Sequence, residues 1–461
     1  MRDTTAPVGD DVAAGMKRRT ILAGAAWSVP VIAVATASPA FAATNDLKLA
    51  FDKTSYSGKA CGTISGVKVT ATRNNVAAPG ESITVTLSNG YTFSDGSTSY
   101  TGTSGADGSI TLPDIKVPAK GGDSPLSATS GSTSASSTAT SPKVNPLHFE
   151  VFTSGSNPAQ YQPSDKIPQD ATPLAGGYYW QSGSTIYRQD GTVATTDAKT
   201  VTADFNNWGD GNQRNLAWTT SKGENKYEVW TQGQDPAQAD ANSKIPSGAT
   251  PLAAGYYWKS GNTVYRQDGT KVAEDVDTVS ADFTNWGTKN QKRIAWTNTS
   301  GKLKEEVWTS GDDPSQGDAS ASGKIPDKST PLAGGLYWQD GKTIYRQDGT
   351  KVTTDAAKVS ATFNNWGTAN QSVVAWTDSD GKLHNEVHTS GSDPSAGTPS
   401  DKIPSNATPL AGGIYWQSGT TIYRGDDGSI AAKDVEAVQA EYTNWGSKNQ
   451  KIFGWRQKLT C

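Results

Sequence analysis

From about residue 46 onward, apolar and polar residues alternate in short runs separated by turn-forming dipeptides. The first four clear runs cover residues 66–72, 82–87, 109–112 and 125–129, with Asn-Gly and Asp-Gly turns between them. Because successive side chains of a strand point to opposite faces, this alternation predicts half-buried strands. Turns at intervals of about ten residues favour a sandwich of antiparallel sheets. The pattern therefore predicts an all-β domain over residues 43–142 and a short linker over 143–147.

Residues 148–461 carry one pattern of aromatic and polar positions four times. The copies open near Glu150, Glu228, Glu306 and Glu386, at steps of 78, 78 and 80 residues. Each copy contains the runs KIP, TPLA, YW, YR, NWG and NQ in the same order. Repetition at a fixed period is typical of arrays and rings. We expect the four β repeats to close into a propeller-like ring; a linear array of β modules is the alternative.

Within the first copy, short β-rich runs predict the strands. Residues 178–180 and 185–188 flank a Ser-Gly turn, and further strands are expected over 200–208, 215–219 and 226–231. The last two strands form a hairpin around Gly223 that crosses the boundary between copies. Strand pairing should therefore connect neighbouring copies, and two groups of two to three strands per copy predict about eight small blades.

Two columns keep tyrosine in all four copies, whereas position 178 accepts Tyr, Leu or Ile, as core filler does. We expect the two tyrosines of a copy to form a cross-strand pair. Such rings are either buried with their hydroxyls bonded or exposed for ligand binding, so they are candidate binding residues. The columns are Tyr179, Tyr257, Tyr337 and Tyr415, and Tyr187, Tyr265, Tyr345 and Tyr423.

Tryptophan recurs in every NWG turn, close to the glutamine of the NQ motif. A ring can stack on the apolar face of a sugar while amide groups bond its hydroxyls, so this column is a further set of ligand-binding candidates. Its members are Trp208, Trp286, Trp366 and Trp445, near Gln213, Gln291, Gln371 and Gln450. Trp180 and its equivalents are expected in the core. A variable column, Phe152, Trp230, Trp308 and His388, is expected to pack near the copy boundary.

The glutamates that open the copies alternate with apolar neighbours. We expect them to face solvent or to pair with a recurring arginine of the YR motif. The arginines are Arg188, Arg266, Arg346 and Arg424.

Cys61 and Cys461 are the two cysteines of the sequence. A disulfide requires Cα atoms about 6 Å apart, which a long linear array would not allow but a ring would. In an oxidising compartment, we therefore predict a bond between Cys61 and Cys461.

The N-terminus combines a basic head with a short apolar stretch and a small-residue end. Lys17, Arg18 and Arg19 precede the apolar stretch, and Ala40-Phe41-Ala42 fits a cleavage site after Ala42. The segment resembles a twin-arginine export signal; a general secretory signal is the alternative, and Met16 is an alternative start. We expect an extracellular or cell-surface protein with no membrane span once residues 1–42 are removed.

Two further resemblances concern the fold. Pro79-Gly80, the ITVTLS run and the GADGSITL run resemble the bacterial immunoglobulin-like domains of invasin and intimin, which act as spacers or adhesive modules. The stretch from NWG to EVWTSG weakly resembles the repeats of the regulator of chromosome condensation, which form propellers. That family's glycine pairs and histidine are missing here, so its partners do not carry over.

Charge and composition narrow the function. The exported chain would carry 37 basic and 42 acidic residues, which argues against nucleic acid and anionic membranes as partners. We find no column shared by His148, His384 and His388, and no repeated metal or catalytic set. The sequence favours a non-catalytic binding protein without cofactor or metal, whose ligand is a glycan or a cell-surface protein. A structural surface or matrix protein and a glycan-processing enzyme are the alternatives.

Overall fold

The computed structural model describes residues 47–153, 155–208, 211–286, 289–319, 323–366, 369–445 and 448–461. The expected signal peptide, residues 1–42, lies outside them. At the four NWG turns only part of the backbone is described, and the side chains of those tryptophans are outside the description. In the described part of the chain, no helix has the length and apolar character needed to span a bilayer.

Residues 47–140 form three sheets around one apolar core, as the alternating pattern predicts. Val69, Ile83 and Leu126, among others, are fully buried there. One sheet contains β1 (Leu47–Phe51), β4 (Lys68–Arg73), β5 (Val76–Ala77) and β9 (Ser109–Thr111). A second contains β2 (Ser55–Ser57), β12 (Thr133–Thr140), β11 (Ser124–Ser130), β6 (Ser82–Thr86) and β8 (Ser99–Thr103). A third contains β3 (Thr63–Ile64), β10 (Ile115–Lys116) and β7 (Thr92–Phe93).

The described residues of the repeat region form eight four-stranded antiparallel sheets, two per copy. Four are large sheets with long central strands. They are β19 (Thr200–Trp208), β20 (Gly211–Thr219), β21 (Asn225–Thr231), β22 (Ala237–Asp240); β27 (Val276–Trp286), β28 (Lys289–Asn298), β29 (Leu303–Thr309), β30 (Ser315–Asp318); β35 (Lys358–Trp366), β36 (Ala369–Thr377), β37 (Leu383–Thr389), β38 (Ser395–Gly397); and β43 (Val435–Trp445), β44 (Lys448–Gln457), β13 (Leu147–Thr153), β14 (Ala159–Tyr161).

Four small sheets alternate with the large ones. They are β15 (Thr172–Leu174), β16 (Tyr179–Ser182), β17 (Thr185–Arg188), β18 (Val193–Thr195); β23 (Thr250–Leu252), β24 (Tyr257–Ser260), β25 (Thr263–Arg266), β26 (Lys271–Ala273); β31 (Thr330–Leu332), β32 (Tyr337–Asp340), β33 (Thr343–Arg346), β34 (Lys351–Thr353); and β39 (Thr408–Leu410), β40 (Tyr415–Ser418), β41 (Thr421–Arg424), β42 (Ile430–Ala432). All-β architecture is thus confirmed, with four strands per sheet instead of the two to three expected.

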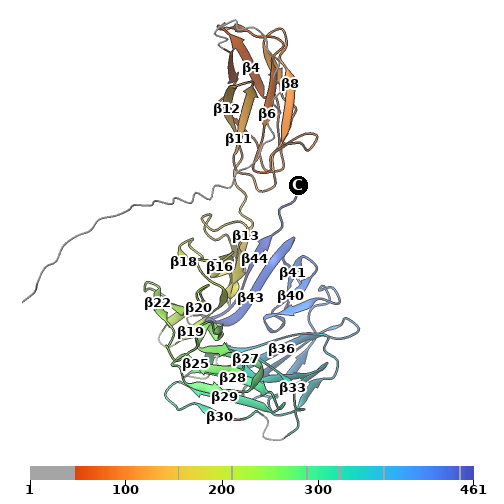
Figure 1. Ribbon diagram of the computed structural model, residues 1–461. Helices are drawn as coiled ribbons and strands as arrows, with labels where there is room; N and C mark the ends of the chain where they lie inside the picture. Colours follow the sequence, from red (N-terminus) through yellow and green to blue (C-terminus); the bar gives the residue numbers. More distant parts are fainter. Residues whose placement is uncertain are drawn as a thin grey trace, which may run out of the picture. The chain divides into compact units, whose positions relative to one another are not determined.

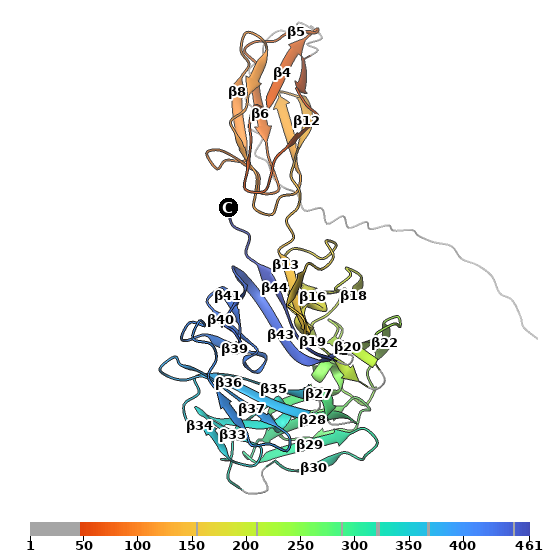
Figure 2. The same ribbon diagram turned by 180° about the vertical axis from the view of Figure 1, so that it is seen from behind.

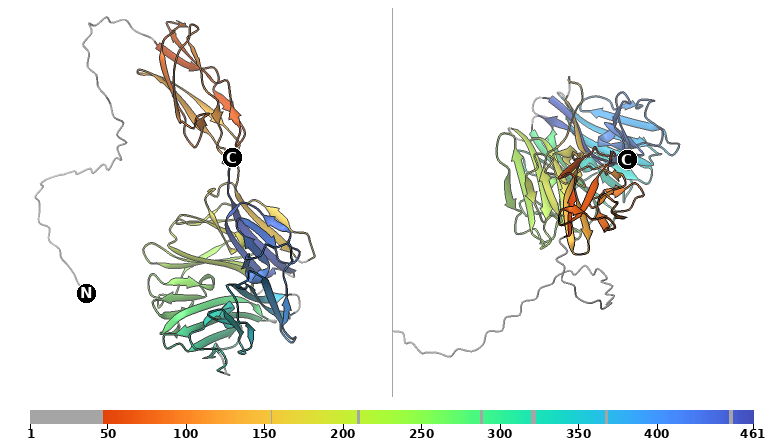
Figure 3. Two further views of the ribbon diagram at one scale, coloured as in Figure 1. Left: turned by 90° about the vertical axis from the view of Figure 1, so that its right-hand side faces the viewer. Right: turned by 90° about the horizontal axis from the view of Figure 1, so that it is seen from above.

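The first and last strands of the repeat region lie in one sheet. β13 pairs with β44 over seven residues, from Leu147 opposite Arg456 to Thr153 opposite Gln450 (Figures 1 and 2). The other large sheets make the same pairing inside one hairpin, β20 with β21 for example. The four long strands β19, β27, β35 and β43 contact one another in cyclic order, and the sheets follow one another around them (Figure 3). A copy therefore completes its large sheet with a strand from the next copy.

A tight turn before each YW motif brings a small sheet against a large one. In the third copy, Gly335 has φ +94°, and a Cβ there would lie 2.6 Å from the Cβ of Ala295 on β28. Gly255 and Gly413 show the same close approach to Ala217 and Ala375. Because both the backbone angle and the space exclude a side chain, glycine recurs at this position.

The expected tyrosine pair across the hairpin is wrong. Tyr179 lies opposite Arg188, and Tyr187 lies opposite Trp180. The two-residue loop Gly183-Ser184 sets Ser182 against Thr185, which fixes this register and places the two tyrosines on different faces. The same pairing holds in the other three copies.

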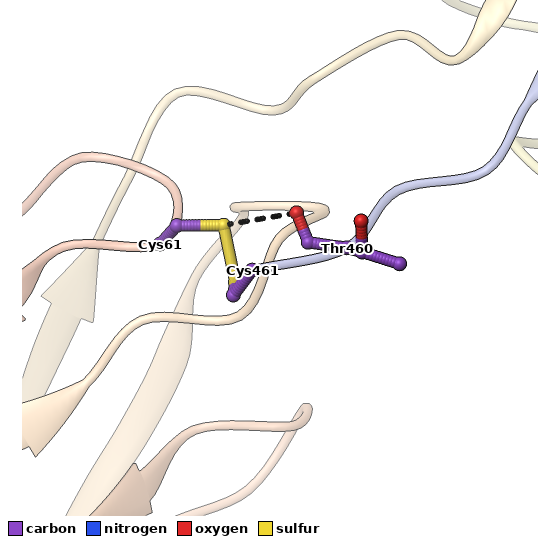
Figure 4. Close-up of a disulfide and its surroundings, with 3 residues drawn as sticks. All are labelled: Cys61, Thr460 and Cys461. Atoms are coloured by element: carbon purple, nitrogen blue, oxygen red, sulfur yellow. Dashed lines mark hydrogen bonds between the residues drawn. A yellow bond between two sulfur atoms is a disulfide. The ribbon is translucent and has the colours of Figure 1, made fainter. Parts of the chain in front are cut away.

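Cys61 and Cys461 form a disulfide that joins residues 400 positions apart, with a Cα–Cα distance of 5.2 Å (Figure 4). The Cys61 Sγ atom also lies 3.7 Å from the carbonyl oxygen of Thr460. The bond ties the last residue of the repeat region to the β3 end of the first domain.

Candidate functional site

The first tyrosine column is buried, which is one of the two arrangements expected for these rings. Tyr179, Tyr257, Tyr337 and Tyr415 are at most 1% exposed. The hydroxyl of Tyr179 donates to Glu228 at 3.2 Å, and that of Tyr257 donates to Glu306 at 3.4 Å. Desolvation raises the pKa of both phenols well above the usual value, so they stay protonated donors.

The second tyrosine column packs against the large sheets. Tyr265 is 8% and Tyr345 is 5% exposed, while Tyr187 and Tyr423 are half-buried. Each ring belongs to a cluster with the core tryptophan opposite it, such as Trp338 for Tyr345. These residues therefore hold small and large sheets together, and a role in ligand binding stays a prediction.

The candidate sugar site at the NWG and NQ motifs is described only in its second half. Each motif glutamine donates its amide hydrogen to a threonine on the neighbouring strand, as Gln291 does to Thr309 at 3.2 Å. The equivalent bonds join Gln213 to Thr231, Gln371 to Thr389 and Gln450 to Thr153. The side chains of Trp208, Trp286, Trp366 and Trp445 lie outside the described residues, so their role stays a prediction.

The glutamate column pairs with arginine, one of the two expectations for it. Glu228, Glu306 and Glu386 accept hydrogen bonds from the arginine of the preceding copy, and Glu150 accepts from Arg424 of the fourth. The four Nε–Oε1 distances are 2.8–2.9 Å, and the glutamates are 0–4% exposed. These pairs connect every copy to the next one, including the last to the first.

A column of cations, missed by the sequence analysis, lies where each small sheet meets the following large sheet. The guanidinium of Arg214 lies 4.2 Å from the ring centroid of Tyr178 and 4.3 Å from that of Trp230. The ammonium of Lys292 lies 4.2 Å from Tyr256 and 4.4 Å from Trp308. A cation between two aromatic faces is attracted by both and fills the space between the sheets.

The third copy differs at this place in three positions. Ser372 replaces the cation, Leu336 replaces the tyrosine, and His388 replaces the tryptophan. In the fourth copy Lys451 is again present, 4.9 Å from the ring of Phe152. The sequence contains a sign of this difference. In the third copy both the variable aromatic column and the position two residues after the NQ asparagine change. We expected mere packing there, since the two columns become neighbours only through pairing across copies.

The smaller side chains of the third copy leave a cavity of about 700 Å³. Leu336, Tyr337 and Ala319 supply apolar wall, and Ser372 lies within hydrogen-bond distance of the Tyr337 hydroxyl, at 3.3 Å. The remaining polar wall comes from β29, β30, β33 and β37 and from the turns after β33 and β37. It consists of Glu305, Asp318, Arg346, Gln347, Asp348, His388 and Ser390.

The charged part of this wall consists mainly of carboxylates, two of which have cationic partners: Glu305 pairs with Arg293 and Asp318 pairs with Lys304. Among the described lining residues, Glu305, Asp318 and Asp348 face one guanidinium, that of Arg346, which is itself paired with Glu386. Burial raises the pKa of Glu305, although Arg293 and the amide of Gln347 act against it. The Gln347 amide donates to both Glu305 oxygens, at 2.9 and 2.7 Å, and so fixes the carboxylate in place.

A second acidic group lies on the long strands. Asp204, Asp282 and Glu441 occupy one column on three of these neighbouring strands, and Thr362 takes the fourth position. Desolvation raises the pKa of Asp282 to about 7 and that of Glu441 to about 8. No group of three or more acidic, histidine or cysteine side chains is arranged to hold a metal ion within the described ranges.

The expectation that the three histidines share no column is wrong for two of them. His148 and His384 do occupy the same column, two residues before the buried glutamate. Both stack on the tryptophan opposite, at centroid distances of 5.1 Å from Trp455 and 5.2 Å from Trp376. His388 lies on the cavity wall of the third copy.

No protein-family model and no curated protein matches the chain. Among solved structures, the WD40 domain of SCAP from fission yeast is similar, with 9% identity, 64% of this chain and 86% of that chain covered, and a TM-score of 0.31. AofleA from Arthrobotrys oligospora shows 11% identity over 63% and 89%, with a TM-score of 0.29. A mutant of the Aleuria aurantia lectin in complex with alpha-methyl-L-fucoside shows 16% identity over 60% and 95%, with a TM-score of 0.25. Likeness of this degree assigns no function.

Proposed function

We propose that the protein is an exported, non-catalytic carbohydrate-binding protein and that the cavity of the third copy is its ligand site. The cavity itself supports this proposal most directly. Its volume, about 700 Å³, suits a small ligand, and binding pockets commonly combine apolar walls with a few fixed polar groups. A sugar ring presents C–H faces that suit Leu336, and hydroxyls that suit the amide, carboxylates and guanidinium around it. Export rests on the N-terminal sequence alone.

The internal comparison supports the choice of this place among four. In the second copy the same position is filled by Lys292 between two aromatic rings, whereas the third copy keeps the ion pair and the glutamine but has smaller side chains around them. Three large side chains have been exchanged for smaller ones without loss of the surrounding sheet pairing. Such an exchange creates space at the cost of packing, and a bound ligand would restore the contacts.

A glycan array probed with the chain from residue 43 tests the proposal first, and calorimetry with the best glycan tests the site. Ser372→Lys should lower the affinity at least tenfold, because the lysine side chain refills the cavity as Lys292 does in the second copy. Ser260→Lys, the same exchange at a strand end of the second copy, is the matched control and should leave binding unchanged. Retained affinity in Ser372→Lys would overturn the site.

A transplant provides the converse test. Tyr256→Leu, Lys292→Ser and Trp308→His together, with Tyr227→Glu, reproduce the third cavity in the second copy. The stoichiometry of glycan binding should then rise from one to two, provided that circular dichroism shows an intact β fold. A chain that binds no glycan but binds a cell-surface protein would replace the carbohydrate by that partner. A chain that binds neither would favour the structural role.

A further inference from the structure

The acidic turn of each small sheet normally has a cation from the following large sheet beside it. In the fourth copy the Lys451 ammonium lies 2.9 Å from Asp426. In the second copy, burial acts to raise the pKa of Asp268, but the hydrogen bonds from Thr270 and the charges of Arg266 and Lys292 lower it overall. In the first copy Arg214 acts on Asp190 in the same way.

In the third copy, Asp348 keeps this turn while Ser372 takes the cation's place. The hydrogen bonds from Thr350 and the charges of Arg346 and Lys324 lower the pKa of Asp348 against the effect of burial, so it remains ionised. Its side chain is exposed to the cavity mouth. The position that a lysine or arginine occupies in three copies is therefore open beside a carboxylate.

A second exchange places a carboxylate and its paired arginine at the same cavity. Glu305 on β29 occupies the position of Tyr227 on β21 in the preceding large sheet. Its side chain is 17% exposed, and Asp318 from β30 lines the cavity as well. Arg293 lies 3.3 Å from Glu305, Lys304 lies 2.6 Å from Asp318, and Arg346 is engaged by Glu386, so each of these carboxylates has a counter-charge. The net change from the second site is therefore the loss of the positive charge beside Asp348. Such a wall favours a positively charged guest.

Building on the proposed function, we propose that the cavity recognises a primary ammonium group on its carbohydrate ligand, that is, an amino sugar with a free amine. The ammonium would take the place that the Lys292 Nζ has in the second copy, near Asp348, and the pyranose would occupy the space of the missing aromatic rings. An N-acetylated sugar lacks the charge, and a neutral hexose lacks the nitrogen, so both should bind more weakly.

Calorimetry with glucosamine, N-acetylglucosamine, glucose and Nα-acetyl-lysine amide tests this inference. Where a monosaccharide binds too weakly, a short oligosaccharide of the same sugar replaces it. Glucosamine should bind at least tenfold more tightly than N-acetylglucosamine. Asp348→Asn should remove most of this preference, so that the affinity for glucosamine falls to that for N-acetylglucosamine. Asp268→Asn alters the same turn in the second copy, where Lys292 fills the site, and should have no effect on any ligand.

The outcomes separate this inference from the proposed function. Equal affinity for glucosamine and N-acetylglucosamine, or a preference that survives Asp348→Asn, overturns the ammonium inference while carbohydrate binding stands. Tighter binding of Nα-acetyl-lysine amide than of glucosamine shows that the cation comes from a peptide and overturns the amino-sugar assignment. Failure of every sugar to bind, with intact folding, overturns the proposed function itself.

Discussion

Glu228 and Asp204 are carboxylic acids of the same large sheet, yet their surroundings neutralise them in different ways. Glu228 lies on β21 and meets the guanidinium of Arg188, the hydroxyl of Tyr179 and the amide of Gln238. Asp204 lies on the long strand β19, where burial and the like charges of Glu441 and Asp282 from neighbouring copies raise its pKa. Glu228 is therefore neutralised by an arginine of the same chain, whereas Asp204 is neutralised when it takes up a proton from solvent.

The difference separates stability from pH sensitivity. In an ion pair that is fully hydrogen-bonded, the Coulomb attraction offsets the desolvation of both groups. Carboxyl groups that lack a cation and face one another favour their protonated form, because burial and mutual repulsion both disfavour the charge. The four arginine–glutamate pairs between copies, here called the outer pairs, should hold the copies together at all moderate pH values. Asp204, Asp282 and Glu441 on the long strands, here called the inner carboxyl groups, should weaken the fold when they ionise.

Removing one cation of an outer pair should have the largest effect. Arg266→Met leaves the Glu306 carboxyl buried without its cation, with only the neutral donors Tyr257 and Gln316, so the free energy of unfolding should fall by roughly 3–5 kcal/mol. Denaturation in urea measures this change. Arg266→Met combined with Glu306→Gln removes both charges and should recover most of the loss. A cost below about 1 kcal/mol for the single variant would show that the pair is not the connection between copies inferred here.

The four outer pairs show what the sequence predicts well. Arginine precedes its glutamate by 40 residues in three copies, and both columns are invariant, so pairing was among the expectations. The eight sheets, the hairpin across the copy boundary and the buried Trp180 column follow from period-two patterns and recurring turns in the same way. Local pattern and repetition carry this part of the fold.

The missed features depend on which strands become neighbours. Tyr179 and Tyr187 lie on different faces because the Gly183-Ser184 loop fixes the register of the hairpin. A shift of one residue in that register would move one of them to the other face. The third cavity combines Glu305 from β29, Leu336 from the turn before β32 and Ser372 from β36. Nothing in a single copy reveals this grouping, because each residue belongs to a separate column until the sheets pack.

The inner carboxyl groups give the second-largest expected effect, and its sign follows from the raised pKa values. The unfolded chain releases these protons near pH 4, whereas folded Asp282 and Glu441 hold them to about pH 7 and 8. Between these values the folded state binds more protons, so the free energy of unfolding falls as pH rises from about 4 to about 8 and changes little beyond. The stabilisation that comes from protonated Asp282 and Glu441 is complete only below about pH 4.

Glu441→Gln tests this half of the comparison. The variant removes an ionisable group while it keeps a side chain of similar size, so it should be about 1–3 kcal/mol more stable than the parent at pH 8 and equal to it at pH 4. The melting temperature recorded from pH 4 to pH 9 measures the difference. The outer-pair double variant Arg266→Met with Glu306→Gln should follow the parent's pH profile, offset by a constant. A Glu441→Gln profile parallel to that of the parent would contradict the assignment.

Neutral polar groups complete the comparison with the smallest expected effect. The hydroxyl of Tyr442 on β43 donates to the Gln371 side-chain oxygen at 2.9 Å, whereas Phe205, Phe283 and Phe363 occupy the equivalent positions on the other long strands. Among the described residues, the side-chain oxygens of Gln213, Gln291 and Gln450 are buried without a hydrogen-bond partner. Each of these three glutamines lies in a copy whose next copy, in cyclic order, has phenylalanine in place of Tyr442.

Tyr442→Phe should therefore lower the free energy of unfolding by about 1 kcal/mol, since it leaves a fourth buried amide oxygen without a donor. Phe363→Tyr is the converse change, because its hydroxyl would reach Gln291, and it should be neutral or stabilising by a similar amount. Urea denaturation of both variants at pH 7 measures the two effects, and neither should alter the pH profile set by Asp282 and Glu441. A loss in Phe363→Tyr equal to that in Tyr442→Phe would show that the phenylalanine sites have no room for a hydroxyl, and that the copies differ there in packing as well as in hydrogen bonding.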